Sequence, residues 1–277
     1  MKQLKSLTIA LGISASTLLS GCYGGEFPVL TYNTHGLNKT FTGANPEENL
    51  PKISPLLNSY DLVLIQENFV PSYGLFDEAE HPYILPKRLF EENEDNRSGL
   101  SRLSYFPTER KHAESWHNCY GYINNGSDCL APKGFTVFEH EVIPEVWIDV
   151  YNLHMDAGDS PKDREAREAQ IEQLVNILYR RSINKAVIVA GDTNLDLADR
   201  HLLEKLLLEG GLQDSCEVLD CPQPNSIDKV LFKSSYLVHL EPLSWQIPSN
   251  FVNDRGQPLS DHSPIVVDFK VSVGYYE

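Results

Sequence analysis

Polar side chains end or interrupt six apolar runs of this sequence, and they are of the kinds that bind cations and transfer protons. Carboxylate and amide oxygens are the ligands that hard cations such as Mg²⁺ prefer. An imidazole beside a carboxylate is held in one tautomer and can act as a general base near neutral pH. The motifs occur, in chain order, at Asn33, Glu67, Asn152–His154, Asp192–Asn194, Asp228 and Asp261–His262.

Taken singly, each motif also has a structural explanation. Asn33 follows a strand-like run and could be a turn residue, and the same holds for Asp192 and Asn194. Glu67 closes an apolar run, where it would be costly to bury unpaired, so it either caps something or binds a cation. A histidine such as His154 in a strand is often a hydrogen-bonded core residue. Only the joint occurrence of the motifs favours a catalytic site.

The elements that carry the motifs are mostly strands. Apolar residues between Asp163 and Arg181 recur at helical spacing, and a second helix is expected from Leu197 to Leu208. This mixture favours a two-sheet sandwich flanked by helices. The polar stretch from Glu91 to Gly126 is interpreted as a long surface excursion. The expected strands are Pro28–Tyr32, Asp61–Gln66, Gly134–Phe138, Val146–Leu153, Ala186–Ala190, Ile227–Phe232 and Pro264–Val273.

The start of the chain resembles a bacterial lipoprotein signal peptide. Two lysines precede an apolar stretch from Leu7 to Leu19 that is too short to span a bilayer. The stretch ends in LSGC, similar to a lipobox, which implies cleavage before Cys22 and lipidation of that residue. An ordinary signal peptide with an accidental cysteine is the alternative. Tyr23 at the next position favours an exported outer-membrane lipoprotein, anchored to the membrane by its lipid.

Four cysteines remain when Cys22 is assigned to the lipid, and in an exported protein they allow three pairings. Local pairing closes short loops and predicts the disulfides Cys119–Cys129 and Cys216–Cys221. A zinc site is disfavoured because no Cys-x-x-Cys spacing is present.

The remaining residues, 23–277, are expected to form one domain with a strongly acidic charge. No repeat, low-complexity run or linker divides them. Without the two leader lysines, 21 basic residues stand against 39 acidic ones, a formal charge of −18. Nucleic-acid-binding proteins usually carry a basic patch, so nucleic acid is the less favoured partner.

In this order the six motifs resemble those of the endonuclease/exonuclease/phosphatase superfamily, which includes deoxyribonuclease I and neutral sphingomyelinases. The Gly-Asp-x-Asn and Ser-Asp-His blocks are the most specific part of the match. Thr193 replaces a frequent aromatic residue and Leu153 a frequent threonine, and neither change removes a group needed for chemistry. The resemblance implies a four-layered α/β/β/α sandwich of two mixed sheets flanked by helices, with the site at one end of both sheets.

Three matching residues are implied to be cation ligands. Glu67 is expected to be the principal ligand of Mg²⁺, assisted by Asn33, with Asp261 close to where a second cation could bind. Mn²⁺ or another divalent cation is the alternative occupant.

The remaining matches are implied to act on the phosphodiester. His262, oriented by Asp228, is expected to be the general base, while Asp192 and Asn194 position the nucleophile or the phosphate. His154 is expected to contact the phosphate and stabilise transition-state charge. A metal and a cationic imidazole would neutralise the diester while the base deprotonates water, so no covalent intermediate is required.

A finer resemblance to bacterial sphingomyelinase C favours a phospholipid such as sphingomyelin as substrate, cleaved by a monomer. It rests on three regions, Ser98–Ser104, Asp128–Gly134 and the acidic loop and helix that follow His154. Asn152 and Lys133 are expected to bind this substrate.

Two other functions and one possible membrane contact also follow from the sequence. A secreted deoxyribonuclease-like endonuclease is the main rival and would be favoured by a basic cleft. A binding protein on the same fold is disfavoured because both histidines and every expected acid are present. The loop from Trp245 to Val252 carries apolar side chains that could enter a lipid surface, although a tryptophan there more often packs onto its own domain. The basic cleft that would favour the endonuclease would involve Arg97, Arg102, Arg110, Lys111 and Lys133.

Overall fold

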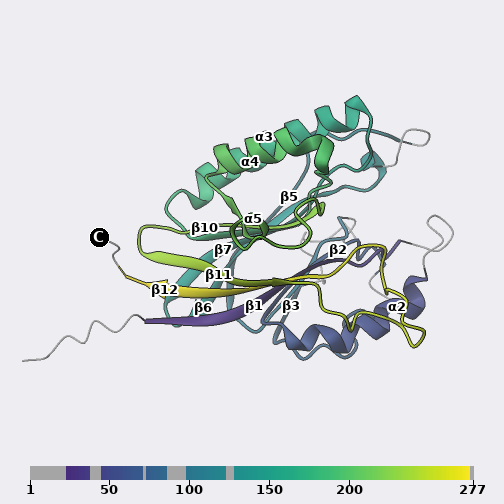
Figure 1. The fold of residues 1–277 in the computed structure, drawn as a ribbon, viewed down its shortest axis with the longest axis horizontal. Helices are drawn as coiled ribbons and strands as arrows, with labels where there is room; N and C mark the ends of the chain where they lie inside the picture. The colour runs from purple at the N-terminus through teal and green to yellow at the C-terminus, as the bar shows by residue number, and fades with distance from the viewer. Residues whose placement is uncertain (1–22, 38–44, 71–72, 86–97, 123–127, 275–277) are drawn as a thin grey trace, which may run out of the picture.

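Two six-stranded sheets pack face to face at the centre of the molecule (Figure 1). The computed structural model describes residues 23–37, 45–70, 73–85, 98–122 and 128–274. The strands of the first sheet are β1 (Tyr23–Asn33), β2 (Leu62–Gln66), β3 (Tyr83–Leu85), β4 (Ser101–Ser104), β11 (Val238–Gln246) and β12 (Ile265–Val273). Their order is β11-β12-β1-β2-β4-β3, and β1 and β2 run parallel.

The second sheet also has six strands, with one parallel pair among them. Its strands are β5 (Thr108–Ser115), β6 (Gly134–Ile143), β7 (Val146–His154), β8 (Val187–Asp192), β9 (Gln213–Asp214) and β10 (Asp228–Lys233). Their order is β5-β6-β7-β8-β10-β9, and here β7 and β8 are the parallel pair. Because the other pairs are antiparallel, both sheets are mixed.

Helices cover the outer faces of both sheets. On the second sheet lie α3 (Pro161–Ser182) and α4 (Arg200–Gly210), with the short α5 (Ser215–Val218) beside β10. On the first sheet lies α2 (Pro46–Ile53), which continues into a 3₁₀ turn (Ser54–Ser59) (Figure 1). One apolar core lies between the sheets and one lies under each helical layer. The expected four-layered sandwich is therefore confirmed.

Helix α3 shows how the sequence specifies these elements. Ser160 and Asp163 form a capping box, and Pro161 occupies the first helical turn, where its missing N–H costs nothing. The apolar stripe of Ile171, Leu174 and Leu178 is then fully buried against the second sheet. The helix is one of the two that the sequence predicts, and the seven expected strands are also present.

The expectation of a surface excursion from Glu91 to Gly126 is wrong, because β4 and β5 lie within it. Strand β5 is polar because it forms an edge of the second sheet, with much of its surface in water. Strand β4 is polar yet fully buried. Its Arg102 guanidinium donates to the Val150 and Thr136 carbonyls and contacts the His140 ring nitrogen Nε2 at 2.8 Å.

Both expected disulfides, Cys119–Cys129 and Cys216–Cys221, are present. The expected signal peptide and Cys22 lie outside the described residues. None of the helices in the described part of the chain is both long and apolar enough to cross a membrane. Phe251, in the loop after β11, is buried under α2. Trp245 lies within β11 and packs against the inter-sheet core, so both side chains contact their own domain.

Candidate active site

The parallel strands at the centre of each sheet end at the same edge of the molecule. Asn33 is the last residue of β1 and Glu67 follows the end of β2. His154 ends β7 and Asp192 ends β8, where the two residues are register partners. Asp228 opens β10, which runs antiparallel to β8, and is the partner of Asp192. The sheet topology thus brings residues from distant parts of the chain together.

Side-chain contacts confirm that these residues share one cluster. Asn33 Nδ2 donates to Glu67 Oε1 at 3.1 Å and to Asp192 Oδ2 at 3.0 Å. The His154 Nε2 atom lies 3.3 Å from Asp192 Oδ2 and 4.0 Å from Glu67 Oε1. The His262 Nε2 atom lies 3.8 Å from the same Asp192 oxygen. Asp192 is therefore the centre of the cluster.

His262 and Asp228 form an imidazole–carboxylate pair. His262 Nδ1 lies 2.7 Å from Asp228 Oδ2, which holds the proton on Nδ1 and leaves Nε2 facing Asp192. Burial alone lowers the pKa of His262, but the hydrogen bond and charge of Asp228, together with Asp192, outweigh it and raise the pKa to about 9. The pair has the arrangement that a general base requires.

Burial disfavours the charged forms of the carboxylates in the cluster. Burial raises the pKa of Glu67. Burial and repulsion by Asp228 raise the pKa of Asp192 to about 6. Buried carboxylates and an amide oxygen are hard ligands, so this set fits a divalent cation such as Mg²⁺.

Two sets of side chains in the cluster could hold that cation. Among the described residues, Asp192, Asp228 and His262 offer ligand atoms within 4.8 Å of one another. Two of these residues are committed to each other, since Asp228 Oδ2 and His262 Nδ1 are hydrogen-bonded. Glu67 and Asn33, on the other side of Asp192, are also hydrogen-bonded to each other, and they remain the cation ligands that the family resemblance predicts.

The backbone around the cluster is strained, as is common at functional sites. Glu67, Asn194 and His35 have positive φ angles of 60°, 51° and 49°, which non-glycine residues rarely adopt. Gly191 has a φ of 140°, and a Cβ there would lie 2.0 Å from the Leu153 carbonyl oxygen. The glycine before Asp192 is thus required by the close approach of β7.

His154, which is expected to contact the phosphate, lies at the end of β7 beside Asp192. This side chain is fully buried, and burial, with the positive charges of Lys133 and His262, holds its pKa well below the usual range. Burial therefore favours the neutral form of the imidazole, which can still donate a hydrogen bond. The Trp116 indole fixes its backbone by donating to the His154 carbonyl at 2.6 Å.

Asn152 lies behind the cluster rather than in it, which corrects its expected role in binding substrate. It has no exposed surface, and its amide donates to the Ile65 and Ser101 carbonyls at 3.0 and 2.9 Å. It also accepts a hydrogen bond from Gln66 at 2.7 Å. Because Gln66 precedes Glu67, Asn152 joins the two sheets directly behind the candidate cation ligand.

The other expected site residues lie at the margins of the cluster. Lys133 Nζ contacts Asp128 Oδ1 at 2.5 Å and donates to the Met155 carbonyl at 3.2 Å. Asn194 Nδ2 donates to the same carbonyl at 3.0 Å, so both side chains flank His154. Asp261 Oδ1 lies 3.0 Å from His35 Nδ1, and the exposed Asp261 carboxylate is thus paired with a residue that the sequence interpretation left without a role.

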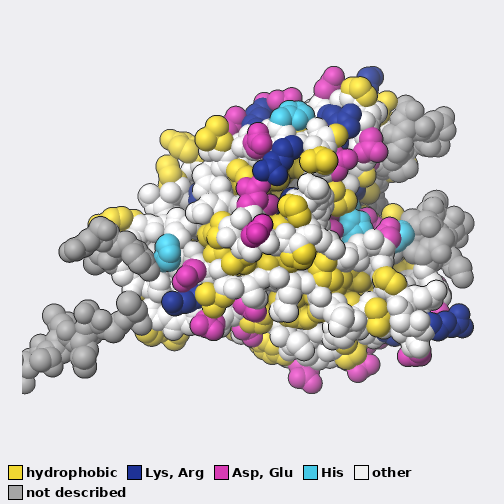
Figure 2. Space-filling model, viewed as in Figure 1, with side chains coloured by type: hydrophobic (Ala, Val, Ile, Leu, Met, Phe, Trp, Pro, Cys, Tyr) yellow, Lys and Arg dark blue, Asp and Glu magenta, His cyan; other side chains and the backbone are white. Residues whose placement is uncertain are grey.

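The basic cleft that would favour a nuclease does not form from the described residues proposed for it. Arg102 is in the core and Lys133 is nearly buried against Asp128. Arg110 and Lys111 are exposed on the edge strand β5, where Arg110 lies 3.5 Å from Glu139, and Arg97 lies outside the described residues. The face shown in Figure 2 has no continuous basic stripe over its described part.

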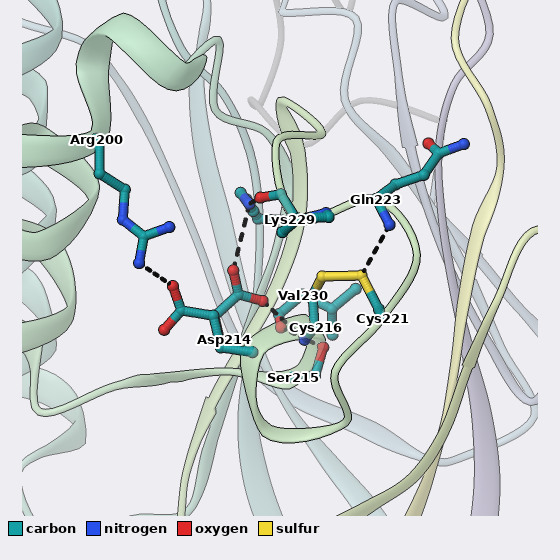
Figure 3. Close-up of a disulfide and its surroundings, with 10 residues drawn as sticks. Arg200, Asp214, Ser215, Cys216, Cys221, Gln223, Lys229 and Val230 are labelled. Carbon is teal, nitrogen blue, oxygen red and sulfur yellow. Dashed lines mark hydrogen bonds and ion pairs between the residues drawn. A yellow bond between two sulfur atoms is a disulfide. The ribbon is translucent and has the colours of Figure 1, made fainter.

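The sequence did not predict a buried ion pair that lies next to Asp228. Lys229 Nζ lies 3.3 Å from Asp214 Oδ2 and donates to the Pro224 carbonyl at 2.9 Å (Figure 3). The Cys216–Cys221 disulfide lies beside this pair (Figure 3). Together they anchor the loop that leads into Asp228. The presence of a lysine within an apolar strand is the sequence feature that could have indicated this ion pair.

Comparisons with known proteins agree with this geometry. The model of the Endonuclease/Exonuclease/phosphatase family matches residues 30–262. A curated sphingomyelinase of Mycobacterium tuberculosis is 29% identical over 291 residues, an alignment that covers 95% of this chain and 56% of that protein. The chain therefore spans little more than half the length of this relative.

Solved structures show the same fold. Sphingomyelinase C from Streptomyces griseocarneus superposes with a TM-score of 0.64 at 20% identity, covering 88% of this chain and 99% of the other. A beta toxin mutant from Staphylococcus aureus with bound magnesium ions gives a TM-score of 0.64 at 16% identity, with the same coverage.

Proposed function

Because the chain belongs to the Endonuclease/Exonuclease/phosphatase family, we propose that it is a divalent-cation-dependent phosphodiesterase that hydrolyses a phospholipid such as sphingomyelin. The observation that carries this proposal is the meeting of Glu67, His154 and Asp192 with the His262–Asp228 pair at one end of both sheets. Cation ligands, a general base and a hydrogen-bonding imidazole lie within reach of a single phosphate.

In this mechanism Glu67 and Asn33 would hold the cation, with Asp261 as an auxiliary ligand. The bound cation supplies positive charge that neutralises the phosphodiester. His262 Nε2 accepts a proton from the attacking water while Asp228 stabilises the imidazolium that forms. The water oxygen bonds to phosphorus as the P–O bond to the lipid alcohol breaks, and the leaving oxygen takes up a proton from solvent.

The remaining polar groups orient the reactants. Asp192, whose Oδ2 faces both imidazoles, positions the water. His154 is a neutral donor to a phosphate oxygen, where transition-state charge develops. Asn194 and Lys133 border the phosphate position, and Asn152 keeps the two sheets in register behind it.

Three observations support the lipid substrate and an exported protein. The curated relative is named a sphingomyelinase. The chain is strongly acidic, which disfavours a polyanionic nucleic acid. Two disulfides suit an oxidising compartment. We retain the lipobox at Cys22 as the proposed membrane anchor, Mg²⁺ as the proposed cation and a monomer as the proposed active form.

The proposal is tested by comparing substrates side by side, with Mg²⁺ and with EDTA. We expect release of phosphorylated head group from vesicles of sphingomyelin or of phosphatidylinositol, and loss of this activity in EDTA because the buried carboxylates then lack their cation. Plasmid DNA and soluble inositol phosphates are expected to remain intact. Robust nicking of DNA with no lipid product would contradict the lipid substrate, and full activity in EDTA would contradict the cation.

A further inference from the structure

Strand β1 connects the catalytic cluster with the opposite end of the sandwich (Figure 1). It ends at Asn33, whose amide contacts Glu67 and Asp192, and it begins at Tyr23. A strand of 11 residues rises about 3.3 Å per residue, so Tyr23 and Asn33 lie about 33 Å apart. The start of β1 therefore marks an end of the molecule that is remote from the chemistry.

The proposed lipid anchor is attached at this remote end. Cys22, the residue that we propose to be lipidated, directly precedes Tyr23 in the sequence. Tyr23 is already part of the first sheet, where its register partner is Val273, and its hydroxyl donates to the Pro144 carbonyl at 3.4 Å. Because the described domain begins at the residue after Cys22, a membrane that holds the lipid lies next to this end.

Exposed apolar side chains surround the start of β1. Tyr23 is exposed, and so are Tyr236 and Leu237 in the turn between β10 and β11. The Leu237 carbonyl accepts from the Gly274 N–H at 3.2 Å, just beyond β12, which places this turn beside β1. Ile183 is exposed at the same end, because it precedes β8, whose other end lies in the cluster. Tyrosines and aliphatic side chains of this kind suit the interface between water and lipid.

Exposed basic side chains also lie at this end of the second sheet. Arg110 and Lys111 are exposed on β5, and Arg180 is exposed in the last turn of α3. The Arg181 guanidinium donates to the Arg110 carbonyl, so β5 and the end of α3 are in contact. The lysine and arginines are thus brought together although they are distant in the sequence.

The acids around these bases leave this edge without the negative charge of the whole protein. Glu139 is buried and contacts both Arg110, at 3.5 Å, and Lys185. Glu109 and Glu145 are the exposed acids nearby, and they stand beside the three exposed bases. Residues 23–277 together carry a formal charge of −18. Anionic lipid, which the protein as a whole would repel, is therefore not repelled here.

We propose that the end of the sandwich at the start of β1 rests on the membrane that holds the Cys22 lipid. The catalytic cluster then faces away from that membrane and acts on lipid in a second, opposing membrane. This orientation rests on the proposed function, which supplies both the lipid anchor and the lipid substrate, and it specifies which membrane provides that substrate. A tether raises the effective concentration only of sites that its geometry lets the enzyme engage, so the anchoring membrane gains nothing from proximity.

The membrane contact is tested without turnover on the lipidated protein, reconstituted into vesicles of phosphatidylcholine and phosphatidylglycerol. A dye that is sensitive to polarity is attached at Leu237→Cys and, in a second preparation, at Val252→Cys. The two side chains are similarly exposed, at 47% and 39%. Val252 serves as the matched control, because its neighbour Phe251 packs against Tyr32 near the cluster end of β1.

We expect the dye at Leu237 to shift its emission to the blue and to be quenched by lipids that carry a nitroxide on the acyl chain. The dye at Val252 should keep the emission that it has in water. Quenching at Val252 alone, at both positions or at neither would overturn the proposed orientation. A mass spectrum without an acyl chain on Cys22 would overturn it as well, because the anchor would then be absent.

Hydrolysis by the anchored protein tests the consequence for the substrate. Sphingomyelin is placed either only in the vesicles that carry the protein or only in protein-free vesicles that are mixed with them. We expect phosphocholine to be released from the protein-free vesicles alone. Release from the anchoring vesicles at an equal or higher rate would overturn the orientation. No release from either, with the dye at Leu237 quenched, would contradict the proposed function while supporting the membrane contact.

Discussion

Replacing His262 with alanine is expected to lower kcat by about 10³- to 10⁴-fold at saturating cation, which is the upper range for loss of a general base. The imidazole is placed for this role by Asp228 at 2.7 Å, and its Nε2 atom faces Asp192. Initial rates on lipid vesicles and on bis(p-nitrophenyl) phosphate measure the loss. The second substrate is soluble and has no lipid part, so its rate reports the chemistry without binding to a membrane.

The pH dependence of kcat/KM tests the role of His262 as general base independently. His262 must lose its Nε2 proton before it can accept one from water. Because Asp228 and Asp192 outweigh burial and raise the pKa of His262 to about 9, activity should increase as the pH rises from neutral toward that value. His262→Ala should lose this rising limb.

His201→Ala is the matched control, since His201 is exposed on α4 and lies on the outer face of the second sheet. Its activity and pH profile should equal those of the wild type. A His262→Ala variant that is folded and retains more than about a tenth of wild-type kcat would exclude His262 as the base, because even a modest general base contributes about 10²-fold.

Replacing Glu67 with glutamine is expected to weaken Mg²⁺ binding by about 100-fold, or about 2.7 kcal/mol, because a principal charged ligand becomes neutral. The shape of the side chain is kept, and Asn33 Nδ2 can still donate to its remaining oxygen. Burial raises the pKa of Glu67, so the metal-free fold gains nothing from the charge that is removed. The melting temperature in EDTA should therefore be unchanged or slightly higher.

Activity measured against Mg²⁺ concentration distinguishes this effect from general damage. The half-saturating Mg²⁺ concentration should rise in Glu67→Gln and stay at its wild-type value in Glu241→Gln, a control on the exposed Glu241–Lys270 pair. Full turnover of Glu67→Gln at low Mg²⁺ would show that the cation binds elsewhere.

The sequence predicted the parts of the site that depend on strand ends. Residues such as Asn33, Glu67 and Asp192 follow apolar runs, and parallel strands necessarily present their ends at one edge of a sheet. The local disulfides were also predictable from spacing, because short loops are readily closed.

Other features depended on contacts that no local pattern encodes. Strand β4 contains Arg102, and an arginine is expected at the surface from the sequence alone. It is buried because its guanidinium donates to backbone carbonyls of the facing sheet. Asn152 shares a strand face with His154, but its side-chain amide donates hydrogen bonds to backbone carbonyls of the first sheet. The pairing of His35 with Asp261 joins two distant loops, so it could not be inferred from either one.

The central claim is that Glu67, His154, Asp192 and His262 surround a single cation-and-phosphate site. Substoichiometric Mn²⁺ provides a direct test, because a bound paramagnetic ion broadens the NMR signals of nearby imidazoles. We expect the signals of both His154 and His262 to broaden, that of His201 to remain sharp, and the broadening to disappear in Glu67→Gln. Broadening of only one of the two imidazoles, or equal broadening of His201, would contradict a single shared site.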